Sequence, residues 1–205
     1  QISAYLFFSS LVITEEYEIT VLATNTANFG GIGEWSFSAL LESDNEKILF
    51  DTGFDENTVL HNATLLKKDL SKVEKVILSH FHGDHTGGLI KLRETYKDIN
   101  PKAFTRVYVA DGFFEQRFDV NGNLRGFIGG FNEVDNFLAN TKRLGIQFIV
   151  LDSPKEIAPN LYLSGPVERV HERVVVSPGF YLKKNGKLEP DLVKDDQSLG
   201  IITPE

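Results

Sequence analysis

The chain has 205 residues, of which 41% are hydrophobic, so it can bury one sizeable core in a single α/β domain. Its formal net charge of −8 opposes binding to a phosphate backbone, and nucleic acid is therefore not an expected partner. The chain contains no cysteine, so disulfides and thiolate metal sites are excluded and any metal must be held by nitrogen and oxygen ligands.

The most apolar stretch of the sequence lies at its start. Residues 2–13 (ISAYLFFSSLVI) are shorter than the roughly 20 residues that a membrane-spanning helix needs, so no membrane span is predicted. A clipped signal peptide within residues 1–13 is one interpretation, but no basic residue precedes the stretch and no small-residue cleavage site follows it. We expect residues 1–16 to be an N-terminal extension, and a cytoplasmic location is favoured over export.

From Tyr17 onward, short β-rich runs alternate with helical patterns. After Gly53, apolar residues recur at helical spacing as far as Leu66, and an apolar strand follows. Strand, helix and strand in this order predict a βαβ unit whose two strands are parallel and interior. The predicted strands of this half, the second and third of which form a hairpin, are residues 17–24, 35–42, 47–51 and 73–79.

The middle of the chain contains a glycine-rich loop and a further helix. Residues 80–88 form the predicted loop, a helix begins near Leu89, and a strand follows at 104–110. Residues 111–132 are rich in glycine, phenylalanine and asparagine without a clean period. We therefore expect them to form a long loop or lid rather than a core element.

A third helix is predicted from Val134 to Leu144, because its apolar residues share one face. Asn132 is the expected N-cap and Gly145 the expected stop. The remaining predicted strands are residues 146–151, 160–164, 172–176 and 198–203.

Four side chains that commonly bind metals fall within six residues of the predicted loop: His80, His82, Asp84 and His85. His80 and His82 are two residues apart, so in extended backbone their imidazoles project to the same side and can bind one metal together. Gly83 lets the chain turn sharply, so Asp84 and His85 can face a second metal a few ångströms away. One histidine beside a strand is more often a core or surface residue, but three of the chain's five histidines lie here, and a metal site is therefore predicted.

This H-x-H-x-D-H pattern, preceded by ILFDTG at 48–53, resembles the metallo-β-lactamase superfamily. Residues 31–42, 79–89, 164–173 and 195–205 are further similar to the branch of dihydropterin-linked ribofuranosylaminobenzene phosphate synthases. The resemblance extends over most of the domain expected from Tyr17 onward. It implies an α/β fold of the metallo-β-lactamase-like αβ/βα sandwich type, with mixed sheets flanked by helices.

The resemblance assigns His80 and His82 to a first metal ion, and Asp84 and His85 to a second. It implies two divalent ions, with zinc as the first choice and manganese or iron as alternatives, because geometry alone rarely excludes them. Asp51 would be a buried acid at the base of the site or, in the simpler interpretation, a turn-capping aspartate.

Members of the superfamily usually add a later histidine to each metal, one of them just after a strand such as the one beginning at Leu199. The sequence given ends at Glu205, before that point. The domain expected at residues 17–205 is therefore predicted to lack its C-terminal part, and four protein ligands alone would leave two metals under-coordinated.

The remaining candidates have weaker signals. Arg169 could meet a substrate phosphate or carboxylate, or form a surface ion pair, and His171 is expected to contact substrate or support a ligand. For Asp195 and Asp196 the default expectation is a surface turn, although either acid could hydrogen-bond a ligating imidazole. His61 lies among polar residues of a predicted helix and is expected to be exposed.

Together these residues predict a metal-dependent hydrolase in which a metal-activated hydroxide attacks an ester, lactone, phosphoester or amide of a small molecule. Asp84 would orient the attacking water and accept its proton. Three alternatives stay open: a pterin-related synthase that forms carbon–nitrogen bonds, a di-iron redox protein, and a truncated metal-binding module without catalysis. The histidine at position 82 argues against the redox class, whose pattern resembles H-x-E-x-D-H, and the sequence does not indicate the oligomeric state.

Overall fold

The computed structural model of the protein describes residues 16–126, 128–168, 170 and 179–202. The strands within these residues are β1 (Glu18–Ala23), β2 (Ser38–Glu42), β3 (Lys47–Phe50), β4 (Lys75–Ile77), β5 (Arg106–Ala110), β6 (Arg117–Phe118), β7 (Gln147–Leu151), β8 (Lys155–Ala158), β9 (Leu161–Leu163), β10 (Tyr181–Lys184), β11 (Lys187–Pro190) and β12 (Leu199–Ile201). The helices are α1 (Thr58–Leu65), α2 (Gly83–Thr86), α3 (Leu89–Tyr96) and α4 (Val134–Arg143). No helix of the described residues is long and apolar enough to cross a membrane.

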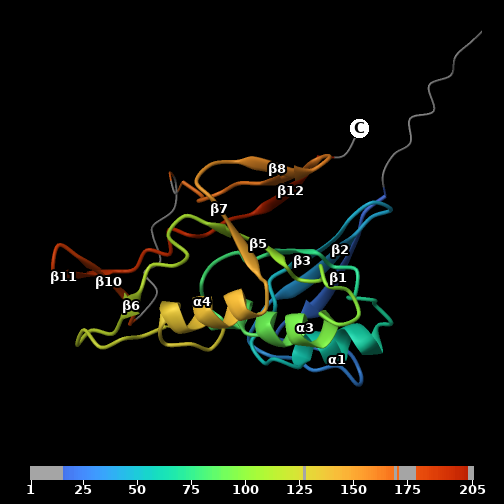
Figure 1. The fold of residues 1–205 in the computed structure, drawn as a ribbon, viewed down its shortest axis with the longest axis horizontal. Helices are drawn as coiled ribbons and strands as arrows, with labels where there is room; N and C mark the ends of the chain where they lie inside the picture. The colour runs from blue at the N-terminus through green and yellow to red at the C-terminus, as the bar shows by residue number, and fades with distance from the viewer. Residues whose placement is uncertain (1–15, 127, 169, 171–178, 203–205) are drawn as a thin grey trace, which may run out of the picture.

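A six-stranded mixed sheet with strand order β1-β2-β3-β4-β5-β7 forms the centre of the fold (Figure 1). β1, β2 and β3 are antiparallel to one another, whereas β3, β4, β5 and β7 run parallel. A helix follows each of the first three parallel strands before the next one begins, so the connections are βαβ units. The predicted hairpin and the predicted βαβ unit are both confirmed.

Alternate side chains of the central strands pack into two separate cores. Leu49, Val76 and Val107 join the core that contains residues of α1, α3 and α4. Their neighbours, including Ile48 and Ile77, join a second core with residues of β8 and β9. This period of two follows from the pleat, which turns successive side chains to opposite faces of a sheet.

The two cores give the fold its layers, as Figure 1 shows. The helices α1, α3 and α4 lie on one side of the six-stranded sheet, and the small sheet of order β12-β9-β8 lies on the other. A third sheet, of order β11-β10-β6, extends from one end of the molecule. The expected α/β class with mixed sheets and flanking helices is confirmed.

The prediction of a long loop or lid at residues 111–132 is wrong in part. Its strand β6 pairs with β10, and Phe113 and Arg117 are almost completely buried. The strand is only two residues long and its partner begins at Tyr181, so no local periodicity could reveal it. Two isolated bridges, such as the one between Phe118 and Leu124, shape the rest of this segment.

The boundaries of the other predicted elements agree with the structure within a few residues. The third helix starts at Val134, as predicted, but its N-cap is Glu133 in place of Asn132. Gly145 follows this helix with a φ of +72°, as expected of a stop. The strand predicted at 172–176 lies outside the described residues, and the strands β8, β10 and β11 were not predicted.

Candidate metal centre

The H-x-H-x-D-H motif lies where β4 gives way to a single turn of helix. His80 comes three residues after the last residue of β4, and His82 is the N-cap of α2, with φ −59° and ψ 146°. Asp84 and His85 lie on α2 itself, so part of the predicted loop is helical. The change from extended to helical backbone at His82 brings the second pair of side chains back toward the first.

The structure brings the three imidazoles of the motif together. The ring centroids of His80 and His85 are 4.2 Å apart, and those of His80 and His82 are 4.6 Å apart. Nε2 of His80 and Nδ1 of His82 face each other at 2.9 Å. The Asp84 carboxylate lies 3.7 Å from Nε2 of His85. The four predicted side chains therefore form one cluster, which stays partly open to solvent.

Asp51 lies beneath this cluster and is 1% exposed. Its carboxylate accepts hydrogen bonds from the backbone N–H of Ser79 at 2.7 Å and from the Ser79 hydroxyl at 2.8 Å. Nδ1 of His85 lies 2.7 Å from the second carboxylate oxygen. Asp51 has a φ of +58°, a backbone conformation that aspartate tolerates better than most residues. The acid thus orients both the residue before the motif and the last histidine of the motif.

Burial and hydrogen bonding change the pKa values of these groups in different directions. Burial lowers the pKa of His82, so this imidazole is held in the neutral form that can bind a metal. Burial would also lower the pKa of His85, but the hydrogen bond to Asp51 and the charge of that residue raise it overall. Burial raises the pKa of Asp51, against the opposing effect of the hydrogen bond and the charge of His85.

Glycines allow the motif to pack directly on the segment that follows β3. A Cβ added at Gly88 would lie 2.3 Å from the carbonyl oxygen of Thr52, and one at Gly87 would lie 2.0 Å from that of Phe54. The backbone N–H of Gly87 donates to the carbonyl of Gly53 at 2.9 Å. Only residues without a side chain permit this approach, which explains the glycine pair after the motif.

A segment from the C-terminal part of the chain holds the backbone of the motif. Asp195 accepts a hydrogen bond from the N–H of Phe81 at 2.8 Å, and the side-chain amide of Gln197 donates to the carbonyl of Leu78 at 2.9 Å. Asp195 is fully buried, so the expectation of a surface turn is wrong for this residue. Asp196 is partly exposed, with its carboxylate 3.7 Å from Nδ1 of His80.

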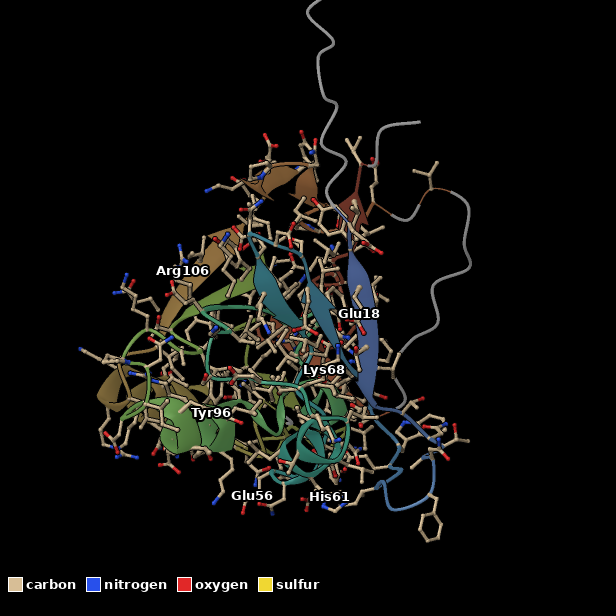
Figure 2. The ribbon with its side chains drawn as sticks, turned by 90° about the vertical axis from the view of Figure 1, so that its right-hand side faces the viewer. Glu18, Glu56, His61, Lys68, Tyr96 and Arg106 are labelled. Carbon is tan, nitrogen blue, oxygen red and sulfur yellow. The ribbon has the colours of Figure 1, made fainter. Side chains whose placement is uncertain are left out.

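The other predicted candidates lie elsewhere. His61 is exposed on α1, and Figure 2 shows it at the outer surface of the molecule, where its Nε2 hydrogen-bonds the carbonyl of Gly30 at 2.7 Å. Arg169 and His171 lie outside the described residues. Sequence reasoning missed Arg117, which is 2% exposed and forms an ion pair with Asp195. A buried arginine in a stretch without periodicity gives no local signal of its partner.

The donors of the cluster fit a divalent metal in their chemistry, since all are imidazoles or carboxylates. Two nitrogens bound to one tetrahedral zinc at 2.0–2.1 Å are about 3.3 Å apart, and the facing nitrogens of His80 and His82 are 2.9 Å apart. Nδ1 of His85 is engaged by Asp51, which leaves Nε2 as the nitrogen suited to a metal. The separation between His80 and His82 is that of a hydrogen bond, and no three acids or histidines of the described residues are spaced to enclose an ion as they stand.

A layered α/β fold with a histidine cluster at the end of a central parallel strand is typical of a class of metal-binding proteins. The sequence profile of the metallo-β-lactamase superfamily matches residues 36–134, which include β2 to β6 and the whole motif. A solved structure described as a metal-dependent hydrolase of the β-lactamase superfamily is 28% identical in sequence and has a TM-score of 0.65. The match covers 91% of this chain and 61% of the chain of the solved structure.

Two curated proteins of Methanocaldococcus jannaschii are also similar. One, named 7,8-dihydropterin-6-methyl-4-(β-D-ribofuranosyl)-aminobenzene-5′-phosphate synthase, is 28% identical over 174 residues, which are 82% of this chain and 56% of the relative. The other is uncharacterised and is 32% identical over 181 residues, which are 88% of this chain and 64% of the relative. The chain thus spans somewhat more than half of the length of these relatives. Residues 36–134 match the metallo-β-lactamase superfamily, as the motif indicated, and the fold is similar to that of a solved protein of this superfamily.

Proposed function

We propose that this chain is a metal-dependent hydrolase that acts on an ester, lactone, phosphoester or amide of a small molecule. The observation that carries the proposal is the convergence of His80, His82 and His85, with the last imidazole oriented by the buried carboxylate of Asp51. A histidine that donates its Nδ1 proton to a carboxylate presents Nε2 as a stronger ligand. The solved relative is likewise described as a metal-dependent hydrolase.

In this proposal His80 and His82 hold a first divalent ion, and Asp84 and His85 hold a second. Zinc is the first choice because all donors are imidazole or carboxylate, and manganese or iron are alternatives. A divalent ion at such a site lowers the pKa of its bound water toward about 7 and polarises the oxygen of the group under attack. The protein would contribute the orientation of its ligands and a proton acceptor.

Asp84 is the proposed proton acceptor. It lies on the first turn of α2, its side chain is 25% exposed, and it faces His85 at 3.7 Å, so solvent and substrate can reach it. A carboxylate in this place can orient an attacking water by accepting one of its hydrogen bonds. Asp51 cannot take this role, because its side chain is 1% exposed and both its oxygens are engaged by Ser79 and His85.

A pterin-related synthase is the second candidate. The name of the 28% identical relative favours it, since that protein is named for a synthase activity. Both candidates would use the same cluster of donors, so metal binding does not distinguish them. A panel of ester, lactone, phosphodiester and amide substrates does, because only a hydrolase releases product from these without a second substrate.

The test is elemental analysis of the purified chain after exposure to zinc or manganese, alongside His82→Ala and His61→Ala. We expect the unchanged protein to retain metal and to hydrolyse a member of the panel, and His82→Ala to lose both properties. His61→Ala is the matched control, because this exposed histidine lies on the outer surface and should leave both unchanged. The proposal fails if the unchanged protein, folded and given excess metal, retains none.

A further inference from the structure

Arg117 is a fully buried cation that the proposed chemistry does not use. Its guanidinium is 2% exposed and donates from Nε to Asp191 at 3.0 Å and from Nη2 to Asp195 at 3.1 Å. Nη1 donates to the backbone carbonyls of Phe113 and Glu115 at 2.8 and 2.7 Å. All three nitrogens of the side chain are therefore bonded inside the protein.

Such a cluster needs an explanation beyond stability. Removing one cation and two carboxylates from water costs free energy for each ion, and apolar side chains of similar volume often stabilise a fold equally well. Asp191 and Asp195 are 1% and 0% exposed, so neither acid is relieved by solvent. The cluster does, however, fix the orientation of its side chains, because a guanidinium and a carboxylate form hydrogen bonds only in certain directions.

One hydrogen bond of this cluster is made to the backbone of the metal-binding motif. Asp195 uses one carboxylate oxygen for Arg117 and the other for the backbone N–H of Phe81, at 2.8 Å. Phe81 lies between His80 and His82 in the sequence, and its ring lies under the guanidinium, with 3.7 Å from the central carbon of Arg117 to the ring centroid. The peptide and the ring of Phe81 are thus held by the same pair of charged side chains.

We propose that Asp195 and Arg117 are positioning residues that set the direction of His80 and His82 for metal binding. The inference rests on the proposed function, since it concerns the same histidines. A rotation of the Phe81 peptide would turn the Cα–Cβ bonds of both neighbours, and the facing nitrogens of His80 and His82, now 2.9 Å apart, would separate. Holding that peptide lowers the cost of arranging the two imidazoles when a metal binds.

Asp191 provides a matched comparison within the same cluster. It is as buried as Asp195 and pairs with the same guanidinium, but its other oxygen accepts from the N–H of Val193 at 2.9 Å, in its own segment. Asp191→Asn and Asp195→Asn each remove one negative charge and one partner of Arg117. Only Asp195→Asn also loses an acceptor for the motif, because the asparagine amide has a single oxygen for two donors.

The experiment measures the dissociation constant for zinc, by competition with a chelator, of the unchanged full chain and of both variants. The unfolding temperature of each metal-free protein is recorded to measure the structural effect. We expect similar falls in unfolding temperature for the two variants. The dissociation constant should rise about 10-fold or more in Asp195→Asn and less than about 3-fold in Asp191→Asn, since partners of metal ligands typically contribute 10–100-fold in affinity. The absorption spectrum of the cobalt-substituted protein should change only in Asp195→Asn.

Asp195→Glu is the second variant, for the case in which Asp195→Asn does not fold without metal. It keeps the charge and the pairing with Arg117 but moves the carboxylate by one methylene, and it should also weaken zinc binding about 10-fold relative to Asp191→Glu. Equal zinc affinities in the Asp195 and Asp191 variants would overturn the positioning role while leaving the proposed function intact. Failure of the unchanged chain to bind zinc, manganese or iron would instead remove the proposed function itself.

Discussion

Nδ1 of His85 lies 2.7 Å from a carboxylate oxygen of Asp51, a residue 34 positions earlier in the chain. The same carboxylate accepts two hydrogen bonds from Ser79, which precedes the motif. One buried side chain therefore joins the end of β3, the start of the motif and the helix α2. Its loss should affect both the stability of the fold and the direction of His85.

Asp51→Asn should lower the free energy of unfolding by about 3 kcal/mol. The asparagine amide replaces one carboxylate oxygen with an NH2 donor, although three neighbouring donors need acceptors at this place. Zinc binding should weaken about 10-fold or more, since His85 loses the carboxylate that orients it. Urea denaturation and a metal competition titration measure the two effects. Asp55→Asn, an exposed aspartate four residues later, is the control. Equal urea midpoints for Asp51→Asn and the unchanged chain would show that the buried acid is dispensable.

Gly88→Ala should destabilise the protein by about 3 kcal/mol through a steric clash. The added Cβ would lie 2.3 Å from the carbonyl oxygen of Thr52, while the φ of −80° at Gly88 suits any residue. Gly200→Ala is the matched control, because its nearest heavy atom would be 3.8 Å from the new Cβ. Thermal unfolding of the two variants gives the comparison. A tolerated Gly88→Ala would mean that the motif and the segment after β3 can separate without cost.

The central sheet and the cluster of donors could be predicted because their signals are local. Short apolar runs rich in β-forming residues identified β2, β3, β4 and β5, and the pairs at 80, 82 and 84, 85 fall within one short stretch. Such a run can be recognised without knowing which strand it pairs with. The direction of each imidazole, by contrast, depends on Asp51 and Asp195, which come from distant parts of the chain.

The missed elements are those whose stability comes from distant or polar contacts. β10 and β11 carry lysines and glutamate rather than an apolar face, so periodicity did not indicate them. Their turn, Asn185–Gly186, has positive φ at both residues, 49° and 78°, and this Asn-Gly pair was the signal that could have predicted the hairpin. Arg117 was missed because its partners Asp191 and Asp195 follow more than seventy residues later.

Asn62→Ala should lower the free energy of unfolding by about 2 kcal/mol and loosen the glycine-rich segment before β2. The buried Asn62 amide donates to the carbonyls of Leu22 and Ile32 at 2.7 and 2.8 Å, and its oxygen accepts from the N–H of Ile32. We expect faster cleavage by a protease within residues 25–33 of the variant. Asn136→Ala, on the exposed face of α4, is the control. Identical cleavage patterns in the two variants would contradict this account of the segment.

Glu42 predicts a pH-dependent part of the stability that is separate from the metal centre. Burial alone would raise the pKa of Glu42, but hydrogen bonds from Lys47 and Lys68 outweigh it and lower the pKa below its ordinary value of 4.5. Lys68 also pairs with Glu18 at 2.8 Å, in the region of Figure 2 where both are labelled. A carboxyl group whose pKa is lowered in the folded state adds stability at pH values above its pKa in the unfolded chain. This contribution is lost as the pH falls through its pKa in the folded state.

Glu42→Gln should therefore be less stable than the unchanged chain by about 1 kcal/mol at pH 6, and the difference should shrink as the pH falls below 4.5. Urea denaturation at pH 6 and at successively lower pH measures it. Glu56→Gln, at an exposed glutamate next to α1, should differ little from the unchanged chain at any of these pH values. Because folded Glu42 binds its proton more weakly than the unfolded chain does, a difference that grew on acidification would have the wrong sign and would exclude this ion-pair network as its source.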